Sequence, residues 1–256
     1  MFILSMVVCF GCEVLAYSEI SHQYVSMDRS GNWQRSLNGK WRFMLNGTEG
    51  KFFTPDFDDS DWEEIPVPGN WEMYGFEEPY YKEPSNSIGL YRKRFTVPES
   101  WNERHVFIRF EGVLFAYELW VNGSLVGSFE SPFNRSEFDI TPFIKWTGDN
   151  ILAVRVYKKY KGYEFDTMGW WALSGIYRDV SLLAVPDIHL KELIVVTDVE
   201  EDLSKSSVWF KIKVGRFEKV RSPVNVDISG RLYGPKGDII DKFTASALLK
   251  GWTYRS

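Results

Sequence analysis

A loop near residue 165 combines aromatic and acidic side chains. Its sequence, YEFDTMGWW, covers residues 163–171 and contains Asp166, Trp170 and Trp171. The face of an aromatic ring stacks on the CH groups of a sugar, and a carboxylate accepts hydrogen bonds from sugar hydroxyls. These three residues therefore have the right chemistry to contact a sugar and are candidate carbohydrate contacts.

The composition is compatible with the same chemistry. Aromatic residues make up 17% of the 256 residues, with 11 Trp, 13 Tyr and 19 Phe. Such side chains favour pleated, half-buried strands, and they also offer flat faces to ring-shaped ligands. Consecutive strand residues face opposite sides, so one of Trp170 and Trp171 must point away from the core. Four other tryptophans more simply fill a sandwich interior: Trp41, Trp62, Trp71 and Trp120.

Other kinds of site leave no pattern in the sequence. It contains no glycine-rich phosphate loop, no HExxH, no paired-cysteine zinc spacing and no nucleophile elbow. Both cysteines, Cys9 and Cys12, lie in the first 12 residues, so the rest of the chain offers no thiol chemistry. His105 and His189 fall on strand patterns and are expected to be half-exposed. The residues alone therefore predict no metal site and no certain cofactor.

The charge balance bears on possible partners. With 30 basic and 35 acidic residues, the net charge of -5 gives no positive surface for a nucleic-acid backbone, and we expect no nucleic-acid partner. The acidic stretch FDDSDWEE, residues 57–64, is interpreted as a solvated turn that leads into a strand.

The N-terminal stretch MFILSMVVCFGC leaves two alternatives open. Its roughly 12 apolar residues are too few to span a bilayer but match the core of a signal peptide, and Ala16 lies at a plausible cleavage distance. However, no Lys or Arg precedes Arg29, where a signal peptide has a basic start. Residues 1–34 are thus either an export or lipid-anchoring segment or a simple extension, and the location is either exported or cytoplasmic, with no transmembrane span.

Apolar residues recur at every second position along most of the chain, and this pattern predicts an antiparallel, all-β sandwich. The segment HVFIRF, residues 105–110, alternates clearly. Residues 118–129 predict a hairpin that turns at Asn122-Gly123, and Asn46-Gly47 indicates a similar turn more weakly. Further strands are expected at residues 91–97, 150–158, 178–185 and 189–196.

A domain boundary is expected near Pro186, where the composition changes. The 71 residues from Pro186 to the end (256 − 186 + 1) are fewer than the roughly 100 of an immunoglobulin-like sandwich. We therefore expect a jelly-roll domain at residues 35–186 and a partial immunoglobulin-like domain at 187–256. The ending ALLKGWTYRS lacks clean alternation, which fits a cut gene product or a reading-frame change.

Six motifs occur in an order typical of one family. Together they strongly resemble the N-terminal sugar-binding domain of family 2 glycoside hydrolases, and WWALSGIYRDVSLL is most similar to the β-galactosidase branch. The motifs are SLNGKWRF (36–43), FDDSDWEEIPVPGNWEMYG (57–75), YRKRFTVP (91–98), FEGV with YELWVNG (110–123), EFDIT (137–141) and SGIYRDV (174–180).

The resemblance implies a jelly roll, then an immunoglobulin-like domain, then a TIM barrel that carries two catalytic glutamates. Such a barrel needs about 250 residues, which the segment after Pro186 cannot supply. The resemblance thus implies no catalytic residue in this chain and a partner in the form of a TIM-barrel catalytic domain or subunit.

The resemblance also implies a role for the loop at 163–171. In β-galactosidases a jelly-roll loop lends polar groups to galactose and to a sodium ion, which makes sodium possible in the full enzyme. The family's aspartate corresponds here to Gly169, although Asp166 could substitute if the loop is rearranged. Tyr81, in the short loop 79–89, is a further candidate sugar contact. Arg178 and Asp179 are expected to support the loop structurally, because a buried Arg needs a carboxylate or carbonyl partner.

Two functional classes remain open. The first is a noncatalytic part of a β-galactosidase-like enzyme that binds a β-galactoside-like carbohydrate, or the same part of a β-glucuronidase or β-mannosidase. The second is a freestanding carbohydrate-binding module.

Overall fold

The computed structural model describes residues 13–16, 32–47, 50–81, 84–166, 171–202, 205–217 and 223–249. The chain divides into two compact units. One covers residues 27–186, and the other combines residues 1–26 with 187–256. None of the helices in the described ranges has the length and apolarity that a membrane span needs.

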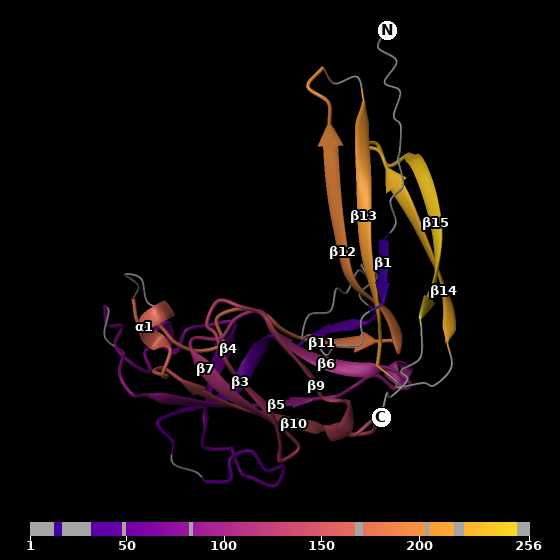
Figure 1. Ribbon diagram of the computed structural model, residues 1–256. Helices are drawn as coiled ribbons and strands as arrows, with labels where there is room; N and C mark the ends of the chain where they lie inside the picture. The colour runs from indigo at the N-terminus through magenta and orange to yellow at the C-terminus, as the bar shows by residue number, and fades with distance from the viewer. Residues whose placement is uncertain are drawn as a thin grey trace, which may run out of the picture. The chain divides into compact units, whose positions relative to one another are not determined.

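The unit at residues 27–186 is a β-sandwich built from two antiparallel sheets (Figure 1). The six-stranded sheet has the order β4 (Glu63–Val67), β3 (Gly39–Leu45), β5 (Ile88–Phe95), β10 (Asn150–Tyr157), β7 (Ala116–Val121) and β8 (Ser124–Glu130). The four-stranded sheet has the order β2 (Gln34–Ser36), β11 (Val180–Val185), β6 (His105–Phe110) and β9 (Ser136–Asp139). Short helical turns connect the strands: η1 (Trp71–Tyr74), η2 (Glu99–Trp101), η3 (Thr141–Phe143) and α1 (Tyr163–Asp166).

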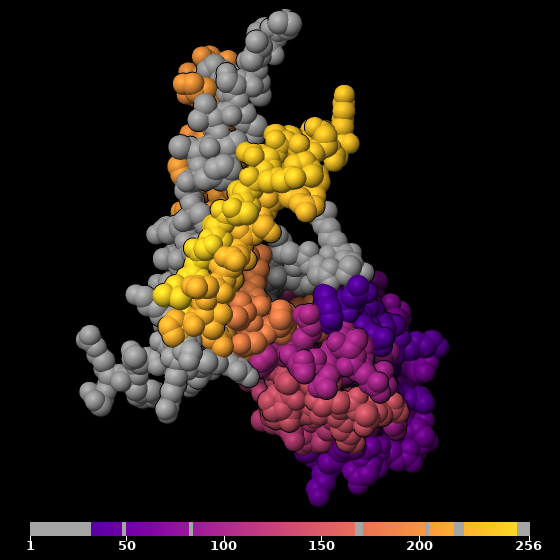
Figure 2. Space-filling view, turned by 90° about the vertical axis from the view of Figure 1, so that its right-hand side faces the viewer, coloured from indigo at the N-terminus to yellow at the C-terminus, as the bar shows by residue number. Residues whose placement is uncertain are grey.

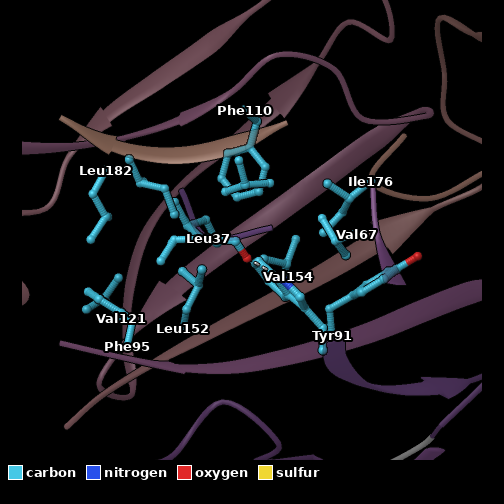
Figure 3. Close-up of a cluster of buried hydrophobic side chains, with 14 of the residues drawn as sticks. Leu37, Val67, Tyr91, Phe95, Phe110, Val121, Leu152, Val154, Ile176 and Leu182 are labelled. Carbon is cyan, nitrogen blue, oxygen red and sulfur yellow. Dashed lines mark hydrogen bonds between the residues drawn. The ribbon is translucent and has the colours of Figure 1, made fainter. Parts of the chain in front are cut away.

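Strand β10 shows why these residues form a sandwich. Its Leu152 and Val154 alternate onto the inner face and share one buried cluster with Phe110 and Leu182 of the opposite sheet (Figure 3). Ala153 faces the other way and is also buried, under aromatic residues that include Phe52, Trp62 and Trp120. Because both faces of β10 are covered, the strand reads as a nearly continuous apolar run, and each large apolar side chain stabilises the fold by about 1.5–3 kcal/mol.

The predicted all-β sandwich is confirmed, and so are most of its local elements. The expected strand at 105–110 is β6, and the expected hairpin consists of β7 and β8. Asn122 and Gly123 have φ angles of 51° and 90°, as this tight hairpin turn requires. The four tryptophans assigned to the interior are all buried.

Among the turns, one interpretation was wrong and another was incomplete. Asn46 has a φ of 54°, but the next strand, β4, begins only at Glu63, so Asn46-Gly47 does not close a two-residue hairpin. The acidic stretch at 57–64 is largely exposed and leads into β4 as expected, but Asp59 Oδ2 lies 2.7 Å from Nε of the buried Arg92. A buried guanidinium needs a carboxylate, and this turn supplies it.

The other unit contains two small sheets. The first has the order β1 (Glu13–Ala16), β13 (Ser206–Arg216) and β12 (Ile188–Val199), in which β1 is parallel to β13. The second is the hairpin of β14 (Val224–Tyr233) and β15 (Ile239–Leu249). Phe210 and Phe243 stack with ring centroids 4.7 Å apart. His189 of β12 is buried and stacks on Phe217, so the expectation that it would be half-exposed was wrong.

The two units should differ in their protection from hydrogen exchange. In the space-filling view, residues 32–166 form a closed mass, whereas β14 and β15 (yellow) form a narrow ribbon (Figure 2). Among the described residues of the second unit, the apolar cluster contains three buried members, Ile212, Val214 and Leu249. We expect slow, cooperative exchange for β5, β6 and β10 and much faster exchange for β14 and β15, measured by mass spectrometry. Equal protection in both units would contradict this expectation.

Candidate functional site

The structure brings two of the sequence candidates together. Tyr81 and Trp171 form an antiparallel bridge, and their rings meet edge to face with centroids 5.8 Å apart. They are 52% and 56% exposed. A second link joins the same two loops, since the Ala172 N–H donates to the Tyr80 carbonyl at 2.7 Å. The result is a pair of fixed but accessible aromatic rings.

Asp166 has a different environment. It ends helix α1, and its carboxylate accepts a hydrogen bond from the Tyr160 hydroxyl. Burial and the neighbouring carboxylate raise the pKa of Tyr160, which therefore stays protonated and keeps donating. Trp170 and Gly169 lie outside the described residues. The structure thus ties Asp166 to Tyr160 and pairs Tyr81 with Trp171.

Arg178 and Asp179 each contact a different neighbour. Arg178 is exposed, so the expectation of a buried arginine was wrong, and its guanidinium lies 5.0 Å from the ring centroid of Tyr177. Asp179 accepts a hydrogen bond from the Asn38 amide at 2.9 Å. Asn38 in turn accepts from the Val180 N–H, which fixes the start of β11.

Sequence reasoning missed a buried polar network that is hydrogen-bonded to the two segments that carry the aromatic pair. Lys158 follows β10, and its Nζ lies 2.7 Å from Glu72 Oε1 and 2.9 Å from Glu77 Oε2. The side chains of Lys158 and Glu72 have no solvent exposure, and that of Glu77 has 13%. The alternation along β10 could have revealed the network. Lys158 follows Leu152, Val154 and Val156 at every second position, so its side chain is expected on the same inner face, where an unpaired charge is not tolerated.

Each carboxylate of the network has a shifted pKa. Partial burial alone would raise the pKa of Glu77, but hydrogen bonds from Lys158, Ser85 and Trp71 outweigh it and lower the pKa to about 2. For Glu72 burial prevails, so its pKa is raised despite hydrogen bonds from Lys158 and Ser174. Glu77 is therefore ionised at neutral pH and accepts hydrogen bonds from several donors.

The residues considered for the sodium ion that the resemblance implies are Gly169 and Asp166. Gly169 has no side-chain oxygen, and one oxygen of Asp166 is engaged by Tyr160. Within the described ranges, no group of three or more His, Cys, Asp or Glu residues could hold a metal ion.

Jelly-roll sandwiches occur among lectin domains, and exposed aromatic rings on their loops suit stacking on sugars, so this architecture is compatible with a carbohydrate-binding domain. The family model described as "Glycosyl hydrolases family 2, sugar binding domain" matches residues 34–186. The chain therefore belongs to glycoside hydrolase family 2, and the predicted resemblance is confirmed.

Curated relatives point to the same family. The chain is 35% identical over 205 residues to a β-galactosidase of Psychromonas ingrahamii, covering 73% of this chain and 20% of the relative. It is also 35% identical over 209 residues to a β-galactosidase of Vibrio cholerae, covering 75% and 20%. The chain thus spans about a fifth of the length of these relatives.

Solved structures show the same fold. A Bacteroides uniformis β-glucuronidase superposes with a TM-score of 0.72 at 25% identity, over 85% of this chain and 26% of the other. The structural match covers 85% of this chain, which is more than residues 34–186 make up, so it extends beyond the range of the family model.

The shifted pKa of Glu77 predicts acid sensitivity. Because its pKa is lower when folded than when unfolded, Glu77 stabilises the unit above about pH 4.5, and this contribution is lost as the pH falls toward 2. We expect a loss on the order of 2 kcal/mol, allowing for the part of the carboxylate that water reaches. Folding raises the pKa of Glu72 above its unfolded value of 4.5. The effect of its protonation on stability is therefore complete at pH values below 4.5 and does not change while Glu77 is being protonated.

The measurement is urea unfolding followed by tryptophan fluorescence between pH 7 and pH 2.5, for the native chain and Glu77→Gln. The variant should be less stable at neutral pH and should lose less stability on acidification. Parallel pH curves for the two proteins would refute the assignment to Glu77.

Proposed function

We propose that this chain supplies one wall of the sugar site of a β-galactosidase-type glycosidase, whose TIM-barrel catalytic part is provided elsewhere. The observation that carries the proposal is the exposed Tyr81–Trp171 pair on a family 2 sugar-binding domain. Two rings held at 68° to each other present a ring face to the CH groups of a pyranose. Asp166 and Trp170 are proposed to extend this wall along the same loop.

The choice of a β-galactoside rests on the relatives. Several proteins that are 30–36% identical to this chain are β-galactosidases. Stacking on an aromatic ring is tolerant of sugar type, so the platform by itself favours pyranoses in general. In this proposal, the finer selection of galactose comes from groups on the opposite wall.

The catalytic step is proposed to belong to the part of the relatives that this chain does not match. Retaining glycosidases need two carboxyl groups about 5 Å apart beside the scissile bond. The carboxylates of the described network are instead occupied by Lys158, at 2.7 and 2.9 Å, under the surface. Glu72 and Glu77 are therefore assigned to structure and not to bond cleavage.

A β-glucuronidase-type enzyme is the second candidate, for a specific reason. Gly169 replaces the aspartate that the β-galactosidase resemblance requires, and a 25% identical solved structure is a β-glucuronidase. A freestanding carbohydrate-binding module is the alternative from another class.

The first test of this proposal is activity. We expect the purified chain to hydrolyse an aryl β-galactoside or an aryl β-glucuronide no faster than buffer, because the two carboxylates of the described network are bound by Lys158 under the surface and are not free to act beside a scissile bond. Continuous release of the aryl group, monitored by absorbance, provides the measurement. Turnover that disappears when a single carboxylate is replaced would overturn the proposal.

The second test is affinity. A single wall buries little of its ligand, so we expect millimolar or weaker binding of methyl β-D-galactopyranoside, about 4 kcal/mol at most. NMR titration should show Tyr81→Ala and Trp171→Ala weakening that binding, whereas Tyr233→Ala should not. Tyr233 is a matched control, since it is 54% exposed but lies in the other unit.

The titration also separates the alternatives. Saturable micromolar binding that is lost in Trp171→Ala, Trp170→Ala or Asp166→Ala would favour the freestanding module. Preference for the matching β-glucuronide would favour the second candidate.

A further inference from the structure

The aromatic pair depends on two loops that no strand ladder fixes. Tyr81 belongs to the segment between η1 and β5, and Trp171 belongs to the segment between α1 and β11. Among the described residues, an isolated bridge, the contact between the two rings and the Ala172–Tyr80 hydrogen bond join the two segments at this point. Two exposed rings on such loops keep their mutual geometry more firmly if both loops are also connected to the sheet.

Glu72 connects the network to the Trp171 side. Its Oε2 accepts the backbone N–H of Ser174 at 2.9 Å, three residues after Trp171. The Ser174 carbonyl accepts the Trp71 N–H at 3.2 Å and the Asn70 amide at 3.1 Å. Glu72 therefore holds the segment after Trp171 against η1.

Glu77 connects the network to the Tyr81 side. Its Oε1 accepts hydrogen bonds from the hydroxyls of Ser85 at 2.5 Å and Ser87 at 2.9 Å, and its Oε2 accepts the indole N–H of Trp71 at 2.9 Å. Glu77 precedes Tyr81 and the two serines follow it. The carboxylate thus ties together both ends of the segment that carries Tyr81.

Lys158 joins the two halves to the sandwich. Its backbone N–H donates to the Ser87 carbonyl at 3.1 Å, directly after strand β10, and its ammonium contacts both Glu72 and Glu77. Two carboxylates facing one buried space repel each other unless a cation lies between them. A neutral side chain of similar length could fill the space but could not hold both carboxylates.

We propose that Lys158 is a positioning residue that fixes Tyr81 and Trp171 as one sugar-stacking platform, acting through Glu72 and Glu77. This inference rests on the proposed function, in which the two rings contact the sugar. Lys158 itself is fully buried and does not touch the ligand.

The test uses the full chain labelled with 5-fluorotryptophan. The Trp171 signal is assigned with Trp171→Phe, and Tyr81→Leu gives the chemical shift that Trp171 adopts when the neighbouring ring is absent. Lys158→Met removes the central cation. Lys159→Met is the matched control, because it makes the same change at the next residue, which is exposed.

We expect the Trp171 signal of Lys158→Met to broaden or to move toward the Tyr81→Leu position, and binding of methyl β-D-galactopyranoside to weaken about tenfold, because two freed side chains must be ordered again on binding. Lys159→Met should match the native chain in both measurements. Far-UV circular dichroism checks that each variant is folded.

Glu77→Gln covers the case in which Lys158→Met does not fold. It keeps an oxygen acceptor and loses the charge that faces Lys158, so a smaller change in the same direction is expected. A folded Lys158→Met or Glu77→Gln chain with a native Trp171 signal and native affinity would overturn the inference, since a purely stabilising role predicts that outcome.

The two proposals fail in different ways. If the native chain shows no binding that depends on Tyr81 and Trp171, the proposed function fails, but the fluorine signal still tests Lys158. If the native chain binds sugar and the network variants leave the ring geometry and affinity unchanged, only the role of Lys158 is rejected.

Discussion

A buried ammonium group shared by two carboxylates is the constraint on which the loops of the proposed sugar-binding platform depend. Lys158 has no solvent exposure, and moving such a charge out of water is costly unless well-placed partners surround it. Glu72 and Glu77 supply the opposite, negative charge, and backbone and side-chain donors satisfy their remaining oxygens. Because leaving any of these groups unpaired would cost several kcal/mol, the loops that carry them are held in one arrangement.

A second buried cation is paired in a similar way in another part of the sandwich. Arg92 of β5 is buried, pairs with Asp59, and donates to backbone carbonyls of the loop before β4, those of Phe52, Thr54 and Phe57. In both places a cation on a strand next to the core gathers oxygens from a long loop and fixes it over the sheet. Apolar packing builds the sandwich, and these two cations fix the loops that strand pairing does not reach.

In the proposed function, this organisation lets the sandwich present part of a binding site. The exposed rings lie on loops that hydrogen bonds tie to the buried network, whereas Asp166 is engaged by Tyr160 and the position of the family's aspartate is a glycine. In the proposed function, stacking dominates the contribution of this chain, and the groups that select and cleave the sugar belong to the part of the relatives beyond its match. The fifth of their length that the chain spans is consistent with that division.

The sequence by itself determined the class of fold, the hairpin at Asn122-Gly123, the family, and that one of Trp170 and Trp171 faces outward, because strand alternation, turn residues and ordered motifs are properties of neighbouring residues. Only the tertiary structure decided which residues meet. Lys158 lies 86 positions from Glu72, and no local pattern encodes that pairing. The same holds for Asp59 with Arg92 and for Tyr81 with Trp171. Such contacts arise from strand order, register and burial over the whole domain, which single-sequence periodicity does not contain.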